Sequence, residues 1–144
     1  MKRDPTDADA RDARAGAKLI PGFTAVESEV IQEVQAALRS DGFKALRQAF
    51  RSGTEAQVTV AGRTVFYVPD LPAGYSGMTM NAVEGFILGP EAMASSEEVA
   101  KTFLHETYRL RMGQSASGAG GGQVADFTRA AHAFADRAYG ALTP

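Results

Sequence analysis

The sequence predicts an α+β domain in which a small antiparallel sheet, made of a hairpin and one short strand, packs against helices. Apolar residues recur at helical spacing from residue 24 to residue 50, alternate with polar residues between residues 56 and 69, and return to helical spacing after residue 95. Because the strands are grouped along the chain and do not alternate one by one with helices, the segregated α+β class is expected. A chain of 144 residues is long enough for one domain with a modest core.

Two helices are expected before the strands. Thr24 and Glu27 stand three residues apart, which is the spacing of a capping box, at the start of an apolar stripe. The stripe consists of Val26, Val30, Val34 and Leu38. The stretch "SDG" interrupts this helix, and apolar residues at helical spacing from Phe43 to Phe50 then predict a shorter helix that ends at Gly53.

The sheet is expected from residues 56–89. "AQVTVAGRTVFYVPD" contains two β-branched and aromatic runs around Ala61-Gly62, which predicts a hairpin that Pro69 ends. "LPAGYSGMTMNAVEG" is expected to be a glycine-rich loop, in which Tyr75 and Met78 either shape a pocket wall or only connect two elements. "GFILG" then predicts a short buried strand.

Two more helices are expected in the second half of the chain. Ser95 or Ser96 can cap a helix that ends near Met112, and Gln123 begins a last helix that runs to about Leu142. The glycine-rich stretch "GQSASGAGGG" between them reads as a linker. At the other end, "MKRDPTDADARDARAGAKLI" has no apolar face, so we assign residues 1–20 to a polar linker and residues 21–144 to a single domain.

Composition restricts the classes of function. Lys and Arg number 15 against 17 Asp and Glu, a net charge of -2, so no global positive field favours nucleic acid or an anionic membrane, and a contact with nucleic acid would have to be local. The chain has no cysteine, which excludes thiol nucleophiles and thiolate metal sites. No apolar run reaches the roughly 18 residues that a membrane span needs, and the N-terminus lacks the order of a signal peptide.

The stretch "TFLHETYRLR", Thr102 to Arg111, contains the candidate catalytic residues. At about 100° per residue, His105 and Arg109 share one helix edge, and Glu106 lies between this edge and the apolar face. A carboxylate there is desolvated, so its pKa can rise toward that of a general acid or base, whereas pairing with Arg109 would keep it ionised. His105, on the more open side, would then transfer protons. The alternative is an ordinary solvated helix edge.

The segment "GFILGPEAMASSEEVAKTFLHETYR" resembles the strand-to-active-helix segment of zincin-class metallopeptidases in order and spacing. In the His-Glu-x-x-His motif of that family, both histidines bind zinc and the glutamate polarises a water. Arg109 stands where the second histidine would be, and a guanidinium cannot ligate a metal. The resemblance therefore implies an altered site for which we expect no metal or other cofactor, with zinc on His105, His132 and carboxylates as the alternative.

His132 is the second of the two histidines of the chain. If the last two helices pack antiparallel, His132 approaches His105, and metal-independent cleavage of RNA becomes an alternative function. One histidine would then take the 2′-hydroxyl proton, the other would protonate the leaving oxygen, and Arg109 would hold the phosphate. Otherwise His132 is an exposed helix residue whose ring Asp136 orients. Candidate substrate-binding residues are Tyr75, Arg63 and Arg111, and Lys101 could add a phosphate contact.

The order of segments also resembles the C-terminal toxin domains of bacterial polymorphic toxins, the Rhs type in particular. The resemblance runs from "AALRSDGFKALRQAF" through the hairpin and the His-Glu helix to the Ala-rich "AAHAFADRAYG". It implies a domain that is released from a larger carrier toxin polypeptide, delivered into a target bacterial cell and neutralised by a cognate immunity protein. Within this role we expect a hydrolase that uses His105, Glu106 and Arg109, with a non-enzymatic partner-binding domain as the alternative.

Overall fold

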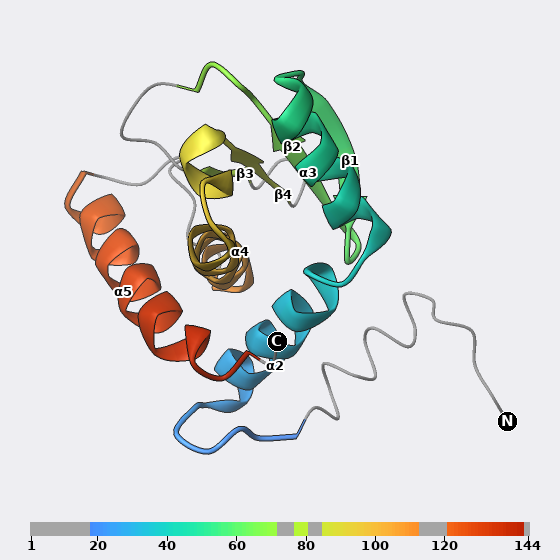
Figure 1. The fold of residues 1–144 in the computed structure, drawn as a ribbon. Coiled ribbons are helices and arrows are strands. Elements are labelled where there is room, and N and C mark those ends of the chain that lie inside the picture. The colour runs from blue at the N-terminus through green and yellow to red at the C-terminus, as the bar shows by residue number, and fades with distance from the viewer. Residues whose placement is uncertain (1–17, 72–76, 81–84, 113–120, 143–144) are drawn as a thin grey trace, which may run out of the picture.

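The computed structural model describes residues 18–71, 77–80, 85–112 and 121–142 of the chain. Its helices are α2 (Ala25–Ala37), α3 (Asp41–Ser52), the 3-10 helix η2 (Pro90–Met93), α4 (Ser96–Arg111) and α5 (Gly121–Tyr139), and its strands are β1 (Ala56–Val60), β2 (Arg63–Tyr67), β3 (Gly77–Met80) and β4 (Gly85–Leu88). One mixed sheet packs against the helices (Figure 1). The expected α+β class is therefore confirmed. The polar linker over residues 1–17 lies outside the described residues.

The expected helix boundaries follow local sequence signals. In α2 the hydroxyl of Thr24 accepts from the backbone N–H of Glu27, and the Glu27 carboxylate accepts from the N–H of Thr24, so the capping box is formed. Helix α3 begins after Ser40, whose hydroxyl accepts from the N–H of Phe43. It ends at Gly53, whose φ of 68° is the left-handed conformation that glycine adopts readily. These are short-range interactions, which explains why the sequence predicts them.

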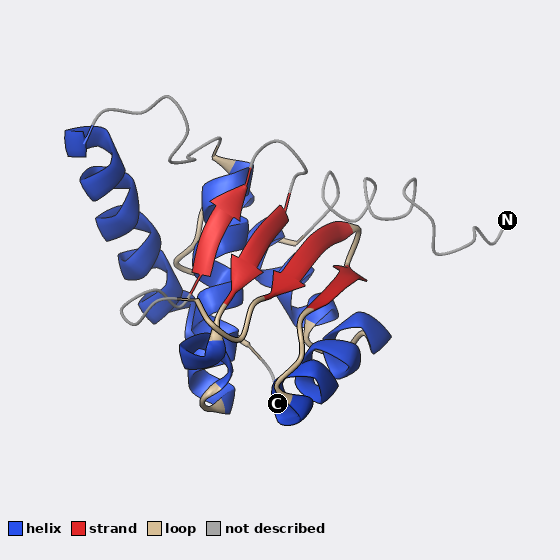
Figure 2. Cartoon of the chain, turned by 90° about the horizontal axis from the view of Figure 1, so that it is seen from above, coloured by secondary structure: helices blue, strands red, loops and turns tan. Residues whose placement is uncertain are grey.

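The sheet is mixed, which corrects the expected antiparallel arrangement. Its strand order is β1-β2-β4-β3, with β1 and β2 joined as the expected hairpin around Ala61-Gly62. Strand β4 runs parallel to β2, and β3 pairs antiparallel with β4 at the edge (Figure 2). The expectation of a loop is wrong over residues 77–80, because the partner strand β4 supplies the hydrogen bonds that make this weakly patterned stretch a strand.

The parallel pair β2–β4 requires glycine at residue 85. A Cβ at Gly85 would lie 1.9 Å from the backbone carbonyl oxygen of Thr64, a distance that no real contact permits. The absence of a side chain at this residue therefore allows the start of β4 to approach β2. A similar approach occurs at Gly42, where a Cβ would lie 2.2 Å from the carbonyl oxygen of Thr59. The lack of a side chain at Gly42 therefore allows α3 to pack closely against β1.

Helix α4 lies in the middle of the molecule, between the sheet and helices α2 and α5 (Figure 1). Nine of its 16 residues are buried, so side chains on more than one of its faces are covered. Phe103 anchors it through edge-to-face contacts with Phe43 of α3 and Phe86 of β4, at centroid distances of 5.6 and 5.2 Å. The residues that bear the candidate site are thus held on the most enclosed helix of the described part of the chain. Within that part, every helix is too short or too polar to cross a bilayer.

Candidate active site

Helices α4 and α5 pack antiparallel, and this packing brings the two histidines together. The amine of Lys101 lies 3.3 Å from the carboxylate of Asp136, and the ring centroids of His105 and His132 are 4.4 Å apart. Each step of four residues along α4 is matched by four residues backward along α5. The conditional expectation that His132 approaches His105 is therefore confirmed.

The two imidazoles have opposite environments. His105 is only 7% exposed, whereas His132 is exposed on α5. The expectation that His105 occupies the more open side is therefore wrong, because α5 covers the helix edge that the sequence leaves facing solvent. Substrate in solution would meet His132 first.

Burial controls the protonation of His105. Three causes together lower the pKa of His105 from 6.5 to about 3: removal of its ring from water is the largest, and Coulombic interactions with His132 and then Arg109 act in the same direction. The Nε2 atom of His105 lies 3.6 Å from Oε2 of Glu106, but an imidazole with this pKa is neutral near pH 7, so the contact is not an ion pair there. Nδ1 of His105 is buried and has no hydrogen-bond partner among the described residues. The ring thus has one polar atom that the described fold does not satisfy.

Glu106 and Arg109 are buried beside this histidine. Their relative exposures are 2% and 8%, which confirms the expected desolvation of Glu106 at the border of the core. A carboxylate and a guanidinium three residues apart on α4 are thus both shielded from water. Charges shielded from water interact more strongly than they would in solvent. The α4 edge therefore combines a neutral imidazole, a carboxylate and a cation under one covering helix.

A more exposed polar contact lies one turn earlier on α4. The amine of Lys101 lies 2.9 Å from the Glu97 carboxylate and 3.3 Å from that of Asp136, and these hydrogen bonds raise the pKa of Lys101 above its ordinary value. Its ammonium also lies over the ring of Tyr139 at 5.5 Å. Asp136, which the sequence places as an orienting partner of His132, is thus engaged with Lys101. This contact fixes α5 on α4 next to the histidine pair.

The candidate substrate-binding residues lie elsewhere or are not described. Arg63 donates to Glu33 of α2, with a second contact of 3.2 Å, and Arg111 donates to Glu29 of the same helix at 2.5 Å. Both arginines therefore lie against α2, whereas His132 belongs to α5. Tyr75 lies outside the described residues, as does the linker over residues 113–120. The described end of that linker, Gly121–Gly122, already belongs to α5.

The metal-ligand set at this site is small. Within the described ranges, no group of three or more His, Asp or Glu side chains is arranged to hold a metal ion. Arg109 places a positive charge beside His105 and Glu106, which opposes cation binding. The described donors thus do not fit the zinc site of a zincin motif.

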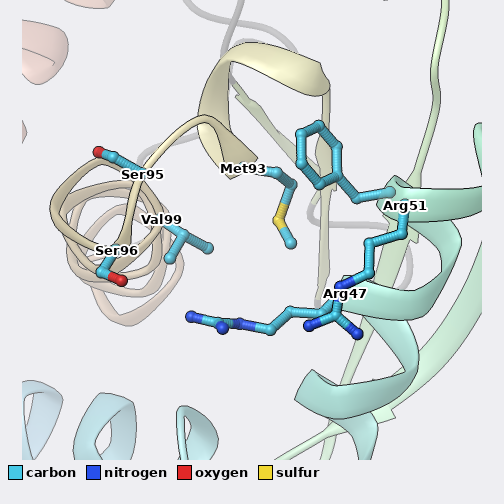
Figure 3. Close-up of a pocket in the computed structure, with 7 residues that line it drawn as sticks. Arg47, Arg51, Met93, Ser95, Ser96 and Val99 are labelled. Atoms are coloured by element: carbon cyan, nitrogen blue, oxygen red, sulfur yellow. The ribbon is translucent and has the colours of Figure 1, made fainter.

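A second polar region, which the sequence analysis does not identify, lies at the start of α4. Arg47 and Arg51 of α3 face Ser95, Ser96 and Val99 across a cavity (Figure 3). The sequence feature that could have indicated this cavity is the pair of arginines one helical turn apart. Such a pair is common on exposed helices, and only the packing of α4 beside α3 makes it part of a cavity.

The two imidazoles differ in what they can contribute to proton transfer. An exposed imidazole is a common general acid or base, whereas His105, whose pKa is about 3, stays neutral and accepts a proton only weakly near pH 7. Comparisons of the chain with protein-family models, with curated proteins and with solved structures found no match, so the site is interpreted from its own geometry.

Proposed function

We propose that the chain is the toxic domain of an interbacterial effector and acts as a hydrolase whose centre is the cluster His105, Glu106, Arg109 and His132. The observation that carries the chemical part is the contact of the His105 and His132 rings at 4.4 Å, beside a buried carboxylate and a buried guanidinium. Burying ionisable groups opposes folding, and clusters of such groups with perturbed pKa values concentrate at functional sites.

The catalytic roles that we propose for the two histidines differ from those that the sequence alone favours. His132 is the general acid or base that meets the substrate, since its ring is exposed. His105 stands behind it as a neutral partner, and Glu106 and Arg109 set the local field. Strand β4, η2 and α4 follow one another in the order expected of a zincin-like segment. We propose that the chain keeps this strand-to-helix arrangement but has Arg109 in place of the second metal-binding histidine.

The biological role is supported by the resemblance to Rhs-type tips. In this proposal, residues 1–20 join the domain to a carrier polypeptide, and the domain acts inside the target bacterial cell until an immunity protein binds it. A hydrolytic centre that is active without a resident metal suits delivery into another cell, because it needs no cofactor loading there.

Metal-independent ribonuclease activity is the second candidate, and the approach of two imidazoles from different helices favours it. Cleavage of RNA at the 2′-hydroxyl needs one group to take a proton and one to give a proton, and no metal. Rings in contact leave no room for a phosphate between them, so the phosphodiester would lie at the exposed edge of His132, and a group other than the buried His105 would have to make the second proton transfer. RNA from growth-arrested cells should then carry 2′,3′-cyclic phosphate ends.

Expression of the domain in bacteria tests the proposal. We expect growth arrest with the wild-type chain and restored growth with His105→Ala, Glu106→Ala or Arg109→Ala, while circular dichroism of each purified variant reports whether it is folded. Toxicity retained in all three variants would show that the domain acts by binding a partner and not by catalysis at this cluster.

A further inference from the structure

An open cavity lies between α3 and the start of α4, and its polar lining residues Arg47, Arg51, Ser95 and Ser96 are exposed to solvent. It has a volume of about 220 Å³, several times the roughly 30 Å³ share of one water molecule in the liquid. Its lining residues are Arg47, Phe50, Arg51, Met93, Ser95, Ser96 and Val99. Figure 3 shows Arg47 extending from α3 toward Ser96 and Val99 on the facing helix. The cavity thus has cationic and apolar lining residues.

The two arginines are distinguished from others in the described part of the chain. Four arginines there have a carboxylate partner: Arg63 with Glu33, Arg111 with Glu29, Arg129 with Asp126 and Arg137 with Glu27. By contrast, the described carboxylates provide no ion pair to Arg47 or Arg51, and the recorded contact of Arg47 is with the ring of Phe43 at 5.1 Å. Like charges one helical turn apart repel each other, so an anion between them would stabilise this pair.

Nearby carboxylates do not neutralise the cavity. Glu97, in the first turn of α4, is directed to Lys101 at 2.9 Å. The Ser95 hydroxyl accepts from the backbone N–H of Glu98 and so caps the helix. The Ser96 hydroxyl belongs to the cavity lining and is a further donor for an anion.

The apolar part of the lining comes from both sides of the cavity and is fixed in place. Phe50 contacts Tyr67 of β2 edge to face at a centroid distance of 6.1 Å, and Met93 and Val99 are buried at 8% and 4% exposure. Apolar side chains beside two guanidinium groups suit a ligand with an anionic end and an uncharged organic part. Guanidinium groups recognise phosphate through paired hydrogen bonds.

We infer that this cavity binds a phosphate ester, with the phosphate between Arg47 and Arg51 and the organic group against Phe50, Met93 and Val99. The site lies at the start of α4 against α3, whereas the histidine pair faces α5. It therefore goes beyond the proposed hydrolase activity and does not depend on it.

Isothermal titration calorimetry tests this assignment with four probes: AMP, adenosine, inorganic phosphate and a short single-stranded RNA. We expect AMP to bind more tightly than inorganic phosphate and adenosine to bind weakly. Arg47→Gln or Arg51→Gln should each weaken AMP binding by about tenfold or more. Lys44→Gln removes a cation from the same helix that does not line the cavity, and it should leave the affinity for AMP within about twofold, since Lys44 would make no hydrogen bond to the phosphate.

Competition between RNA and AMP shows whether the bound phosphate belongs to a polymer or to a small ester. RNA that competes with AMP would place a polymer phosphodiester in the site, and RNA that does not compete would restrict the site to mononucleotide-like esters. Equal affinities for AMP and inorganic phosphate, no binding of AMP, or equal losses in the Lys44 and Arg47 variants would each overturn the assignment. Calorimetry measures binding without turnover, so a negative result here would not affect the hydrolase proposal. A negative result in the toxicity test would likewise not affect the proposed phosphate-ester site.

Discussion

The imidazole of His105 is buried and lies against the exposed imidazole of His132, with ring centroids 4.4 Å apart and ring planes inclined by 48°. One ring comes from the central helix α4 and the other from the covering helix α5. The pair therefore connects the interior of the domain to its surface, and the protonation of the inner ring depends on how α5 covers it.

The first prediction concerns pH. The folded-state pKa of His105 is about 3, below the ordinary 6.5, so between these values the unfolded chain binds a proton that the folded chain does not. The resulting stability is fully present above pH 6.5 and is lost as the pH falls toward 3, with a slope of at most about 1.4 kcal/mol per pH unit. Chemical denaturation at pH 7 and at pH 5 should show this loss.

His105→Gln is the matched variant for this measurement, because it keeps a polar side chain of similar size but cannot titrate. The difference in unfolding free energy between pH 7 and pH 5 should be smaller in the variant than in the wild-type chain. Equal differences in the two proteins would mean that His105 is not held neutral by burial. Glu106, Arg109 and His132 face this ring and remain in both proteins.

The second prediction is that Glu106 and Arg109, three residues apart on α4, pair with each other. Both are buried, so removing one charge should leave the other uncompensated and lower the free energy of unfolding by about 3–5 kcal/mol in Glu106→Gln or Arg109→Gln. The double variant should lose less than the sum of the single losses. A double-mutant cycle measured by denaturant unfolding checks this.

The exposed pair Asp126 and Arg129 has the same three-residue spacing on α5, with exposures of 70% and 72%, and is the control. Its cycle should give a coupling below about 1 kcal/mol, since solvent screens exposed ion pairs. Additive losses at Glu106 and Arg109 would show that each has a separate partner.

The third prediction concerns metal. Arg109 stands where a zincin motif would have its second histidine, and the described donors do not form a cluster of three, so the purified domain should contain less than about one equivalent of zinc, and a chelator should not change its unfolding midpoint. Elemental analysis and thermal unfolding with and without EDTA measure both. One full equivalent of zinc lost together with the fold would identify His105 and His132 as ligands.

The fourth prediction concerns the mixed sheet. Gly85→Ala places a Cβ where the Thr64 carbonyl oxygen lies, so β4 must move away from β2, and we expect a loss of roughly 1–3 kcal/mol of stability. Gly140→Ala is the control, because the nearest atom to its Cβ would be at 3.9 Å, an ordinary contact. Equal stability of the two variants would contradict the parallel register of β2 and β4.

Local and non-local features differ in how well the sequence predicts them. The capping box of Thr24 and Glu27 and the glycine end of α3 depend on residues a few positions apart, and both were predicted. The parallel direction of β4 and the existence of β3 depend on pairing between distant segments, which the pattern of either strand alone does not specify.

The same distinction applies to the site. Helical spacing correctly placed Glu106 at the border of the core, because that border is a property of α4 itself. It misjudged the exposure of His105, since α5 covers that edge from more than twenty residues away in the chain. The approach of His132 was predicted only on condition that the two helices pack antiparallel, and the cavity at Arg47 needed the start of α4 to close it.

The most direct test of the proposed centre is the toxicity of His132→Gln compared with Arg129→Gln in bacteria that contain equal amounts of folded domain. Both residues are exposed on α5, so neither substitution should disturb the fold, and only His132 contacts the ring of His105. The account predicts that His132→Gln loses about 10²–10⁴-fold in activity, the usual contribution of a general acid or base. Arg129→Gln should arrest growth as the wild-type chain does. Growth arrest of equal strength by both variants would contradict a catalytic role for the histidine pair.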